Sequence, residues 1–460
     1  MATLFWFRRD LRLQDNAALN ASIEKAMAGN DARVLACYVV NLHDFEALSA
    51  VRQHSLTESL NALGASMNRM LTIRQARDAA DVAKQLEALC KKHGITEVFA
   101  TEAFDPAGIA EQQEVATVLR VSGITLKLAD SYYAVSPGKV IKPDGSNYRV
   151  YTPFQKAWME IGWQKPYQLP SADQFSWLYD DEDCHGRPNC AQPAPFEIKA
   201  GEAFALRTWE RFKQRALYNY DEVRNRADLS GTSHLSHALA FGEIHPRTLL
   251  AQLADVSGHN VYRKELAWRE FYADVLWHNP HTVDGYYEPK FTRMRYDTGA
   301  LADERLEAWK AGKTGYPIVD AGMRQLARDG WMHNRVRMIA ASFLVKDLHL
   351  EWTVGADWFE QHLTDFDPAS NSHGWQWTAG CGTDASPYYR IFNPTLQGYK
   401  FDPDGNYVRK YIPELSHIEG AAVHEPWLLI DGSAFGYPTP IVDHAVERNE
   451  ALARFDELKT

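Results

Sequence analysis

The chain has 460 residues, which is enough for two or more domains and a sizeable core. Its formal net charge of −11 argues against nucleic-acid binding over the whole surface, although a local basic patch is compatible with it. The five cysteines are scattered and show no zinc spacing, and no apolar run is long enough to span a membrane, so we expect a cytoplasmic, membrane-free protein without a metal site.

Strands and helices alternate over the first part of the chain. Residues 3–7, "TLFWF", form an apolar run that predicts a buried strand, and similar runs follow at 32–40, 70–76, 95–102 and 124–131. Helical patterns lie between them, and the pattern over 81–94 ends in a lysine pair and a glycine. This alternation predicts an α/β domain with a doubly wound parallel sheet over residues 1–132.

The composition changes after residue 132. Residues 133–195 are rich in Pro, Gly, Tyr and Trp, which predicts an interdomain connector packed on the surface. From residue 196 to 460 the apolar residues recur with helical spacing and no clear strand is visible. We therefore predict a large all-helical C-terminal domain.

The segment "KELAWREFY" places a carboxylate and two aromatic rings on one face of a predicted helix. Glu265, Trp268, Arg269 and Tyr272 are spaced i, i+3, i+4 and i+7. A carboxylate beside Trp in a partly dry pocket is a candidate hydrogen-bond acceptor or proton donor, because desolvation raises its pKa. The alternative is that Glu265 forms an ion pair with an arginine.

A second face of this kind follows in "WMHNRVRM". As a helix, this segment would bring Trp331, Asn334, Arg335 and Met338 to one side. Such a face suits a planar ligand with a polar edge, and Arg335 could hold a phosphate. The alternative is a helix that straddles core and rim.

Two polar segments complete the candidate site. "DLSGTSHLS" places small and hydroxyl residues at a predicted helix start, where free N–H groups could bind an anion or the residues could simply cap the helix: Gly231, Thr232, Ser233 and Ser236. "TDFDPASN" supplies short polar groups that could bond ribose hydroxyls or a ring edge, or could only form a turn: Asp365, Asp367 and Asn371.

Two tryptophans stand one residue apart in "GWQW", residues 374–377. On a helix their side chains point roughly 200° apart, so Trp375 and Trp377 should face different surroundings. Together with Trp352 they form a series of tryptophans close to the polar segments. A phosphate cradle, a planar ring and ribose contacts indicate a dinucleotide, and the helical half has no strand-borne glycine fingerprint. A flavin dinucleotide held by helices fits this combination better.

The same residues carry a resemblance to a known family. "FWFRRDLRLQDNAAL", "GTSHLS", "ELAWREFY", "TGYPIVDAGMRQL", "GWMHNRVRM", "SNSHGWQW" and "YYRIFNPTLQGYKFDPDG" resemble the photolyase/cryptochrome family, and look most like class I cyclobutane pyrimidine dimer photolyases. The resemblance runs from the first predicted strand to near the C-terminus and is densest over 220–425.

The resemblance implies an N-terminal antenna domain and a helical domain that binds FAD. The flavin pocket would use Tyr220, Thr232, Ser233, Leu235, Ser236, Arg269, Trp331, Asn334, Arg337, Asp365, Asp367 and Asn371. The lesion pocket would use Glu265, Trp268, Asn334, Met338 and Trp377, with Arg335 at the phosphate of the lesion. Asn371 falls where the family places a residue near N5 of the flavin, and an amide there is similar to the photolyases.

The implied activity is light-driven repair of DNA that contains pyrimidine dimers. Fully reduced, excited FAD would give an electron to the dimer, which splits and returns it, while Glu265 and Asn334 bond the lesion and Trp268 and Trp377 pack against it. Trp375 and Trp352 would carry electrons to oxidised flavin from the surface.

The sequence departs from the family pattern at three places. The usual third tryptophan of the electron chain is missing, and Tyr296 is the candidate in its loop. The stretch "AFDPAGIAEQ" lacks the Asn-Glu pair of folate-binding members, so a second antenna chromophore would be of another kind, such as a deazaflavin, or absent. His234 stands where arginine is common.

Three alternative functions use the same sequence features. A cryptochrome photoreceptor would hold the same flavin without repair, but the lesion-pocket residues argue for repair. An enzyme for (6-4) photoproducts would have histidines at the positions of Asn334 and Met338. A dark flavin oxidoreductase would need a nicotinamide site, and none is visible. We expect a monomer.

Overall fold

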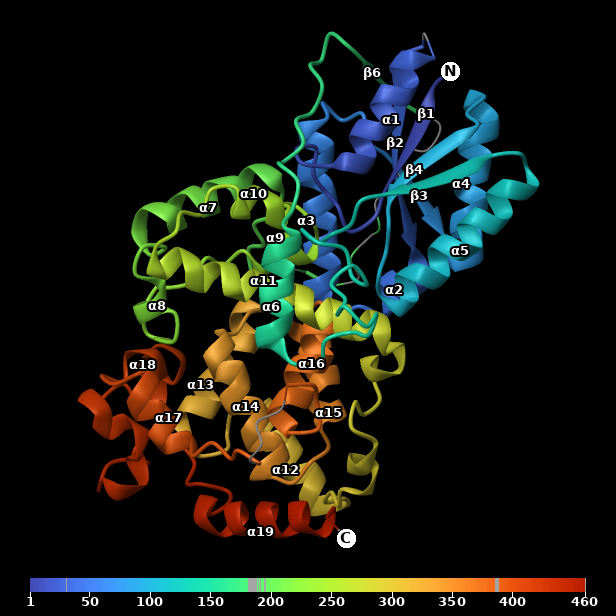
Figure 1. Cartoon of the computed structure of the whole chain (residues 1–460). Helices are drawn as coiled ribbons and strands as arrows, with labels where there is room; N and C mark the ends of the chain where they lie inside the picture. The colour runs from blue at the N-terminus through green and yellow to red at the C-terminus, as the bar shows by residue number, and fades with distance from the viewer. Residues whose placement is uncertain are drawn as a thin grey trace. The chain divides into compact units, whose positions relative to one another are not determined.

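The structure is a computed structural model that describes residues 1–29, 31–180, 188, 190, 192–193, 196–384 and 389–459. The chain forms two compact units. The sheet unit comprises Met1–Tyr148, Thr152–Arg215 and Ser233–Pro280, and the helical unit comprises Arg149–Tyr151, Ala216–Thr232 and His281–Thr460. Figure 1 shows the strands in the blue and cyan part of the chain and the orange and red part as helices. The domain boundaries at 132 and 195 stay predictions.

The sheet unit contains a doubly wound parallel sheet, as the alternating pattern predicts. Its main strands follow the order β3-β2-β1-β4-β5, and all the pairings are parallel. The strands are β1 (Thr3–Phe7), β2 (Arg33–Asn41), β3 (Thr72–Ala76), β4 (Glu97–Thr101) and β5 (Thr125–Ala129). Each lies within the range expected from its apolar run or differs from it by one to three residues at an end.

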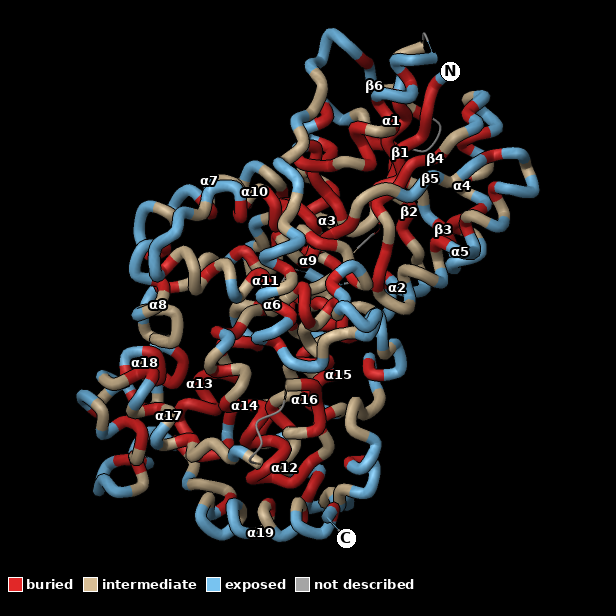
Figure 2. Tube along the Cα trace, viewed as in Figure 1, coloured by how far each residue is buried: buried red, intermediate tan, exposed pale blue. Residues whose placement is uncertain are grey.

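Strand β1 is buried on both faces, which explains its unbroken apolar run. Phe5 and Phe7 belong to one core cluster, with residues of α1 (Ala17–Ala28) and α3 (Ala50–Ser66). Leu4 and Trp6 belong to a second cluster, with residues of α4 (Ala79–His93) and α5 (Pro106–Val121). Alternate side chains of a strand point to opposite faces, so helices cover the sheet on both sides. The red β1 in Figure 2 reflects this burial.

The predicted connector contains two regular elements that its Pro- and Gly-rich composition did not reveal. Helix α6 (Tyr151–Ile161) buries Phe154 and Trp158, and strand β6 (Ser176–Leu178) pairs in parallel with β2. The segment is therefore more than a surface loop. Residues 181–187, 189, 191 and 194–195 of the predicted connector lie outside the described part of the chain.

The remaining elements are helical, as predicted. In the described ranges 196–384 and 389–459 no strand occurs. The sheet unit adds α7 (Glu202–Arg215), α9 (Ser236–Ala240), α10 (Pro246–Leu250) and α11 (Ser257–His278). The helical unit contains α8 (Tyr220–Val223), η1 (Pro280–Val283), η2 (Pro289–Arg293), α12 (Ala300–Lys310), α13 (Pro317–Asp329), α14 (Asn334–Lys346), α15 (Trp352–His362), α16 (Pro368–Ala379), α17 (Pro394–Phe401), α18 (Asn406–Tyr411), η3 (Pro413–Leu415), η4 (Gly420–His424), η5 (Pro426–Leu428) and α19 (His444–Glu457).

Buried charge in the sheet unit is neutralised internally. Arg247, which is 2% exposed, forms a two-pronged pair with Asp130 at 2.9 and 2.5 Å. Its Nη2 also lies 3.0 Å from Asp15 Oδ1. An arginine that is taken out of water needs such partners, because an uncompensated buried charge is strongly destabilising. None of the helices in the described residues has the length and apolarity that a membrane span requires.

Candidate functional site

Helix α11 (Ser257–His278) carries the predicted face with a carboxylate and two aromatic rings. Glu265, Trp268, Arg269 and Tyr272 lie on this one helix and all four are half-buried, which confirms their common spacing. The Trp268 ring lies 5.5 Å from the Tyr272 ring between centroids. Because these four side chains are partly exposed, they can contact a ligand without any change in the helix.

Arg269 is held by its own unit. Its guanidinium donates to the carbonyl oxygens of Tyr132 at 3.1 Å and Leu239 at 3.2 Å, and it lies 4.5 Å from the centre of the Tyr133 ring. These contacts fix the side chain in place, while its contact with a flavin remains a prediction.

The same helix separates two glutamates with different surroundings. Glu270 is 2% exposed and accepts hydrogen bonds from the backbone N–H of Ala134 at 2.5 Å and of Val135 at 3.0 Å, and from Trp158 Nε1 at 2.6 Å. Burial raises the pKa of Glu270 to about 7, against the opposing effect of these donors. Glu270 is therefore a structural carboxylate, and Glu265 is the one that lies on the half-buried face.

The segment "GTSHLS" is a loop that leads into a short helix. We predicted a helix start over Gly231–Ser236, but α9 begins only at Ser236 and its N-cap residue, Leu235, makes no side-chain cap bond. His234 takes a φ of 52°, which turns the chain before the helix can start. The hydroxyl of Ser233 lies 3.1 Å from that of Tyr262, and Leu235 is buried. Gly231, Thr232 and Ser233 therefore precede the helix and do not form its first turn, and the anion site at this segment stays a prediction.

Tyr220 opens the short helix α8 in the helical unit. The side chain is 7% exposed, and the guanidinium of Arg224 lies 5.8 Å from the centre of its ring. Thr232 closes the same stretch of the helical unit, at the point where the chain leaves it. Their contacts with a flavin remain predictions.

Helix α14 starts three residues later than the pattern predicts. Gly330 ends α13 in the left-handed region at φ 61°, and Nδ1 of His333 accepts from the N–H of Arg335 at 3.1 Å as an N-cap. The helix therefore begins at Asn334. The prediction that Trp331 shares a helix face with Asn334, Arg335 and Met338 is wrong, since Trp331 precedes the helix.

Asn334 lies exposed on the first turn of α14. Arg335 and Met338 are half-buried on the same turn and the next one, and Arg335 Nη1 lies 3.6 Å from Met338 Sδ. These three predicted residues therefore do come together at one end of a helix.

Asp365 has one oxygen in an internal ion pair and one with no partner. Its Oδ2 accepts from Arg337 Nη2 at 2.7 Å, and Arg337 Nε is itself anchored on the carbonyl of Met332 at 2.8 Å. Its side chain is only 1% exposed, yet its buried Oδ1 has no hydrogen-bond partner within the described residues. A buried carboxylate oxygen without a donor is costly, so this atom is placed to accept from a ligand.

The other two residues of "TDFDPASN" flank the start of α16. Asp367 is its N-cap and accepts from the N–H of Ser370 at 2.9 Å, so turn and capping chemistry does account for part of its role. Asn371 is half-buried, and its Nδ2 donates to the carbonyl of Ala356 in α15 at 3.1 Å. This bond fixes the amide and leaves its oxygen directed elsewhere.

Trp375 and Trp377 face different surroundings, as predicted. Trp375 is 3% exposed and packs edge-to-face on Phe359 at 4.9 Å between ring centroids, whereas Trp377 is half-buried. Gly355 makes room for the indole, because a Cβ at 355 would lie 2.2 Å from Cη2 of Trp375. Both indoles of the predicted electron chain, Trp375 and Trp352, are buried with an Nε1 that has no partner in the described part of the chain.

Trp352 contacts a tyrosine that the sequence reasoning missed. Its ring lies edge-to-face with that of Tyr286 at 6.1 Å between centroids. The hydroxyl of Tyr286 is 3.1 Å from that of Tyr296 and donates to Glu351 Oε1 at 2.8 Å. Tyr286 thus lies between Trp352 and Tyr296, on a segment between η1 and η2 where no periodic pattern drew attention to it.

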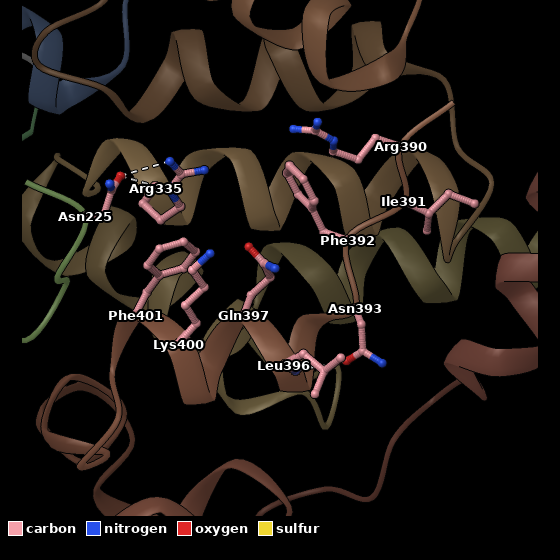
Figure 3. A pocket seen from close by; sticks show the side chains of 10 residues that line it. All are labelled: Asn225, Arg335, Arg390, Ile391, Phe392, Asn393, Leu396, Gln397, Lys400 and Phe401. Atoms are coloured by element: carbon pink, nitrogen blue, oxygen red, sulfur yellow. Dashed lines mark hydrogen bonds between the residues drawn. The ribbon is translucent and has the colours of Figure 1, made fainter. Parts of the chain in front are cut away.

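A cationic cavity of about 560 Å³ lies in the helical unit (Figure 3). Three cations line it from different elements: Arg335 from α14, Lys400 from α17, and Arg390 from the segment before α17. No acidic residue occurs among the described residues that line it: Asn225, Arg335, Arg390, Ile391, Phe392, Asn393, Leu396, Gln397, Lys400 and Phe401. The cavity is therefore suited to an anion.

Asn225 and Phe401 contact Arg335 in this cavity. Its Nε and Nη2 donate to Asn225 Oδ1 at 3.2 and 2.9 Å, drawn dashed in Figure 3, and its guanidinium lies 4.7 Å from the centre of the Phe401 ring. Asn225, Arg390 and Lys400 were not predicted as site residues. Arg390 and Lys400 stand in "YYRIFNPTLQGYKF", which is part of a motif that carries the family resemblance. Two cations within this motif were the signal that could have identified them.

Two family models match the chain. Residues 3–171 match the model described as DNA photolyase, and residues 262–457 match the FAD binding domain of DNA photolyase. The chain therefore carries the FAD-binding domain of this family.

Relatives named deoxyribodipyrimidine photo-lyase match it over nearly the full length. The protein of Escherichia coli is 35% identical, over 98% of this chain and 98% of its own. The protein of Agrobacterium fabrum is 36% identical, over 99% of this chain and 98% of its own.

Solved structures agree with the fold. A class III photolyase from Agrobacterium tumefaciens has a TM-score of 0.87 at 35% identity, covering 99% of this chain and 97% of that chain. An archaeal photolyase from Sulfolobus tokodaii, which contains two FAD molecules, has a TM-score of 0.85 at 26% identity, covering 99% and 100%. A Synechocystis cryptochrome, at 24% identity and a TM-score of 0.82, shares the fold over 98% of both chains. Full-length similarity to named photo-lyases, with a parallel-sheet unit and a helical unit in the same chain, places it in the photolyase/cryptochrome family of flavoproteins, as a light-dependent deoxyribodipyrimidine photo-lyase.

Proposed function

We propose that this photolyase splits cyclobutane pyrimidine dimers in DNA, with fully reduced FAD as its cofactor. The observation that carries the DNA part is the cavity lined by Arg335, Arg390 and Lys400, with no acid among its described lining residues, in a chain of net charge −11. Phosphate binding needs a local cluster of cations. The cavity supplies three of them on one part of an acidic protein.

The residues of the helical unit fit FAD. Asp365 Oδ1 is a buried acceptor without a donor, and the isoalloxazine and ribityl groups of a flavin offer N–H and O–H donors. The amide of Asn371, fixed by Ala356, adds a second polar group near the start of α16. The proposed flavin residues are those of the sequence prediction: Tyr220, Thr232, Ser233, Leu235, Ser236, Arg269, Trp331, Asn334, Arg337, Asp365, Asp367 and Asn371. Bound and reduced, FAD would supply the light-driven electron for ring opening.

The chain's own residues would bind and orient the lesion. A dimer must leave the base stack, and half-buried Trp268 and Trp377 offer aromatic faces whose stacking is worth roughly 1–3 kcal/mol per base, which offsets part of that cost. Glu265 and Asn334 would hydrogen-bond the pyrimidine edges, with Met338 packing beside them. Arg335 would hold the phosphate of the lesion.

Buried indoles support an electron route to oxidised flavin. Trp375 and Trp352 are 3% and 1% exposed, on helices α16 and α15 that pack against each other. Burial without a hydrogen-bond partner at Nε1 is costly for a core tryptophan, and it is consistent with a role beyond packing. Tyr296 remains the predicted outer member.

The alternatives differ in the lesion pocket. An enzyme for (6-4) photoproducts is not favoured, since Asn334 and Met338 stand where it would need histidines. A cryptochrome receptor without repair remains the second candidate, because it would use the same flavin residues. A second antenna chromophore, a monomeric state and a cytoplasmic location stay predictions.

The decisive test is repair of a single-stranded oligonucleotide with one thymine cyclobutane dimer, read by chromatography. Reduced protein should restore the thymines under blue light and not in the dark, and a parallel (6-4) substrate should stay unchanged. Absence of repair by protein that binds FAD and photoreduces it would establish the cryptochrome alternative instead.

A further inference from the structure

Tyr286 contacts both a tryptophan of the proposed electron route and a carboxylate that can accept a proton. Its ring contacts the buried indole of Trp352 edge-to-face at 6.1 Å between centroids, and its hydroxyl donates to Glu351 Oε1 at 2.8 Å. Glu351 is the residue directly before Trp352 and the N-cap residue of α15. The start of α15 therefore supplies both the aromatic ring and the carboxylate that contact Tyr286.

The phenol of Tyr286 is kept protonated. Burial raises the pKa of Tyr286 well above its ordinary value, and the neighbouring Tyr296 and Glu351 add to the effect. A phenol has one proton and an ionised carboxylate can only accept, so this proton points to Glu351. An electron can leave such a tyrosine at low cost only when the proton leaves with it.

We propose that Tyr286 is the residue that reduces oxidised Trp352, and that Glu351 takes the tyrosine's proton in the same step. One electron passes from Tyr286 to the Trp352 radical cation, the Oη–H bond of Tyr286 breaks, and the proton goes to Glu351 Oε1. The products are neutral Trp352, a neutral tyrosyl radical and a protonated Glu351. A thiol or ascorbate reductant in solution would later return the electron, and Glu351 the proton.

This inference rests on the proposed electron route through Trp375 and Trp352. It revises the order along that route, because Tyr286 lies between Trp352 and the predicted member Tyr296. Trp352 is buried, whereas Tyr286, Tyr296 and Glu351 are each partly exposed. The radical would thus move from the core toward solvent, and the separated proton would keep it from returning quickly.

The test is flash photolysis of the FAD-containing protein with oxidised flavin. Transient absorption and electron paramagnetic resonance distinguish tryptophan radicals from neutral tyrosyl radicals. The unaltered protein should show a tryptophan radical that decays into a tyrosyl radical. Tyr286→Phe should lose the tyrosyl signal and keep the tryptophan signal, whereas the matched variant Tyr296→Phe should keep both. A tyrosyl signal that survives Tyr286→Phe would overturn the proposal.

A second pair of measurements isolates the proton and the route. Glu351→Gln keeps an acceptor oxygen but cannot take a proton, so tyrosyl formation should be slowed and its rate difference between H2O and D2O should change; unchanged kinetics would remove Glu351 from the step. Trp352→Phe should abolish both radicals beyond Trp375. If either radical still forms in Trp352→Phe, the proposed route itself is wrong. If Trp352→Phe abolishes both radicals but Tyr286→Phe behaves like the unaltered protein, only the role of Tyr286 is refuted. Absorbance of bound FAD confirms that each variant is folded.

Discussion

Two arginines, one in each unit, show how differently the molecule uses the same side chain. Arg247 in the sheet unit is 2% exposed and is neutralised by Asp130 and Asp15. Arg335 in the helical unit is half-buried, donates to the neutral amide of Asn225, and lines a cavity whose described lining residues include two more cations and no acid. The first cation stabilises its own unit, and the second lies beside two other cations on the wall of a cavity. The same contrast separates Glu270 from Glu265 and Trp375 from Trp377.

The largest expected effect is on folding. Arg247→Ala would leave the buried carboxylate of Asp15 and the half-buried carboxylate of Asp130 without this cation, and breaking a buried pair costs about 3–5 kcal/mol. Urea denaturation followed by circular dichroism measures this loss. Arg335→Ala is the matched control and should stay within about 1 kcal/mol of the unaltered protein, as for most partly exposed positions. Equal losses for the two variants would remove the distinction.

The two glutamates of α11 should separate in the same way. Glu270→Ala leaves three donors without an acceptor, two of them buried, and each buried unsatisfied group costs about 1–3 kcal/mol. Thermal unfolding should show a clearly lowered midpoint. Glu265→Ala should unfold normally but reduce the quantum yield of dimer repair by a few-fold, since one hydrogen bond of about 1 kcal/mol is lost. An unchanged yield in Glu265→Ala would mean that Glu265 has no part in repair.

The tryptophans of α16 should differ in DNA binding. Trp377→Ala should weaken binding to dimer-containing DNA by about 1–3 kcal/mol, the typical contribution of stacking on one base, and weaken binding to undamaged DNA much less. Fluorescence anisotropy with paired oligonucleotides measures both constants. Trp375→Phe should leave this selectivity intact and block photoreduction of oxidised flavin. The stacking role fails if Trp377→Ala weakens both DNAs equally.

The smallest expected effect is on salt dependence. Arg390→Ala should weaken binding to any DNA sequence and reduce the slope of log K against log salt by about 1, the value for one lost phosphate contact. Arg295 is a suitable control, because this cation pairs with Glu450 and Glu457 at 3.1 Å each. Its replacement by alanine should leave the slope unchanged. If both variants alter the slope alike, the cavity has no special part in DNA binding.

Local patterns were sufficient for the sheet and for several helices. The apolar run of β1 predicted a strand buried on both faces, and Gly94, at φ 64°, ends α4 where the glycine stop was expected. The spacing of Glu265, Trp268 and Arg269 held because α11 is one uninterrupted helix. In such cases each residue's position follows from its neighbours in sequence.

Patterns failed where a cap or a tertiary contact decides the structure. The start of α14 depends on His333, whose ring nitrogen caps the helix although histidine is not a usual N-cap residue. The helix in "GTSHLS" was placed too early because the φ of His234 is not visible in the sequence. Tyr286 and Arg390 lie on irregular segments. They become candidates only through tertiary contacts, because Tyr286 bonds Glu351 and Arg390 lines the same cavity as Arg335.

The residue at position 355 limits which residue can stand at position 375. A Cβ at 355 would lie 2.2 Å from the Trp375 ring and 2.5 Å from Leu344 Cδ2, so even alanine would displace the indole. A variant chain can gain a side chain at 355 only if it accepts a smaller ring at 375. Random mutagenesis that selects for light-driven flavin reduction should therefore recover glycine at 355 whenever tryptophan stays at 375, and the two positions should change together or not at all.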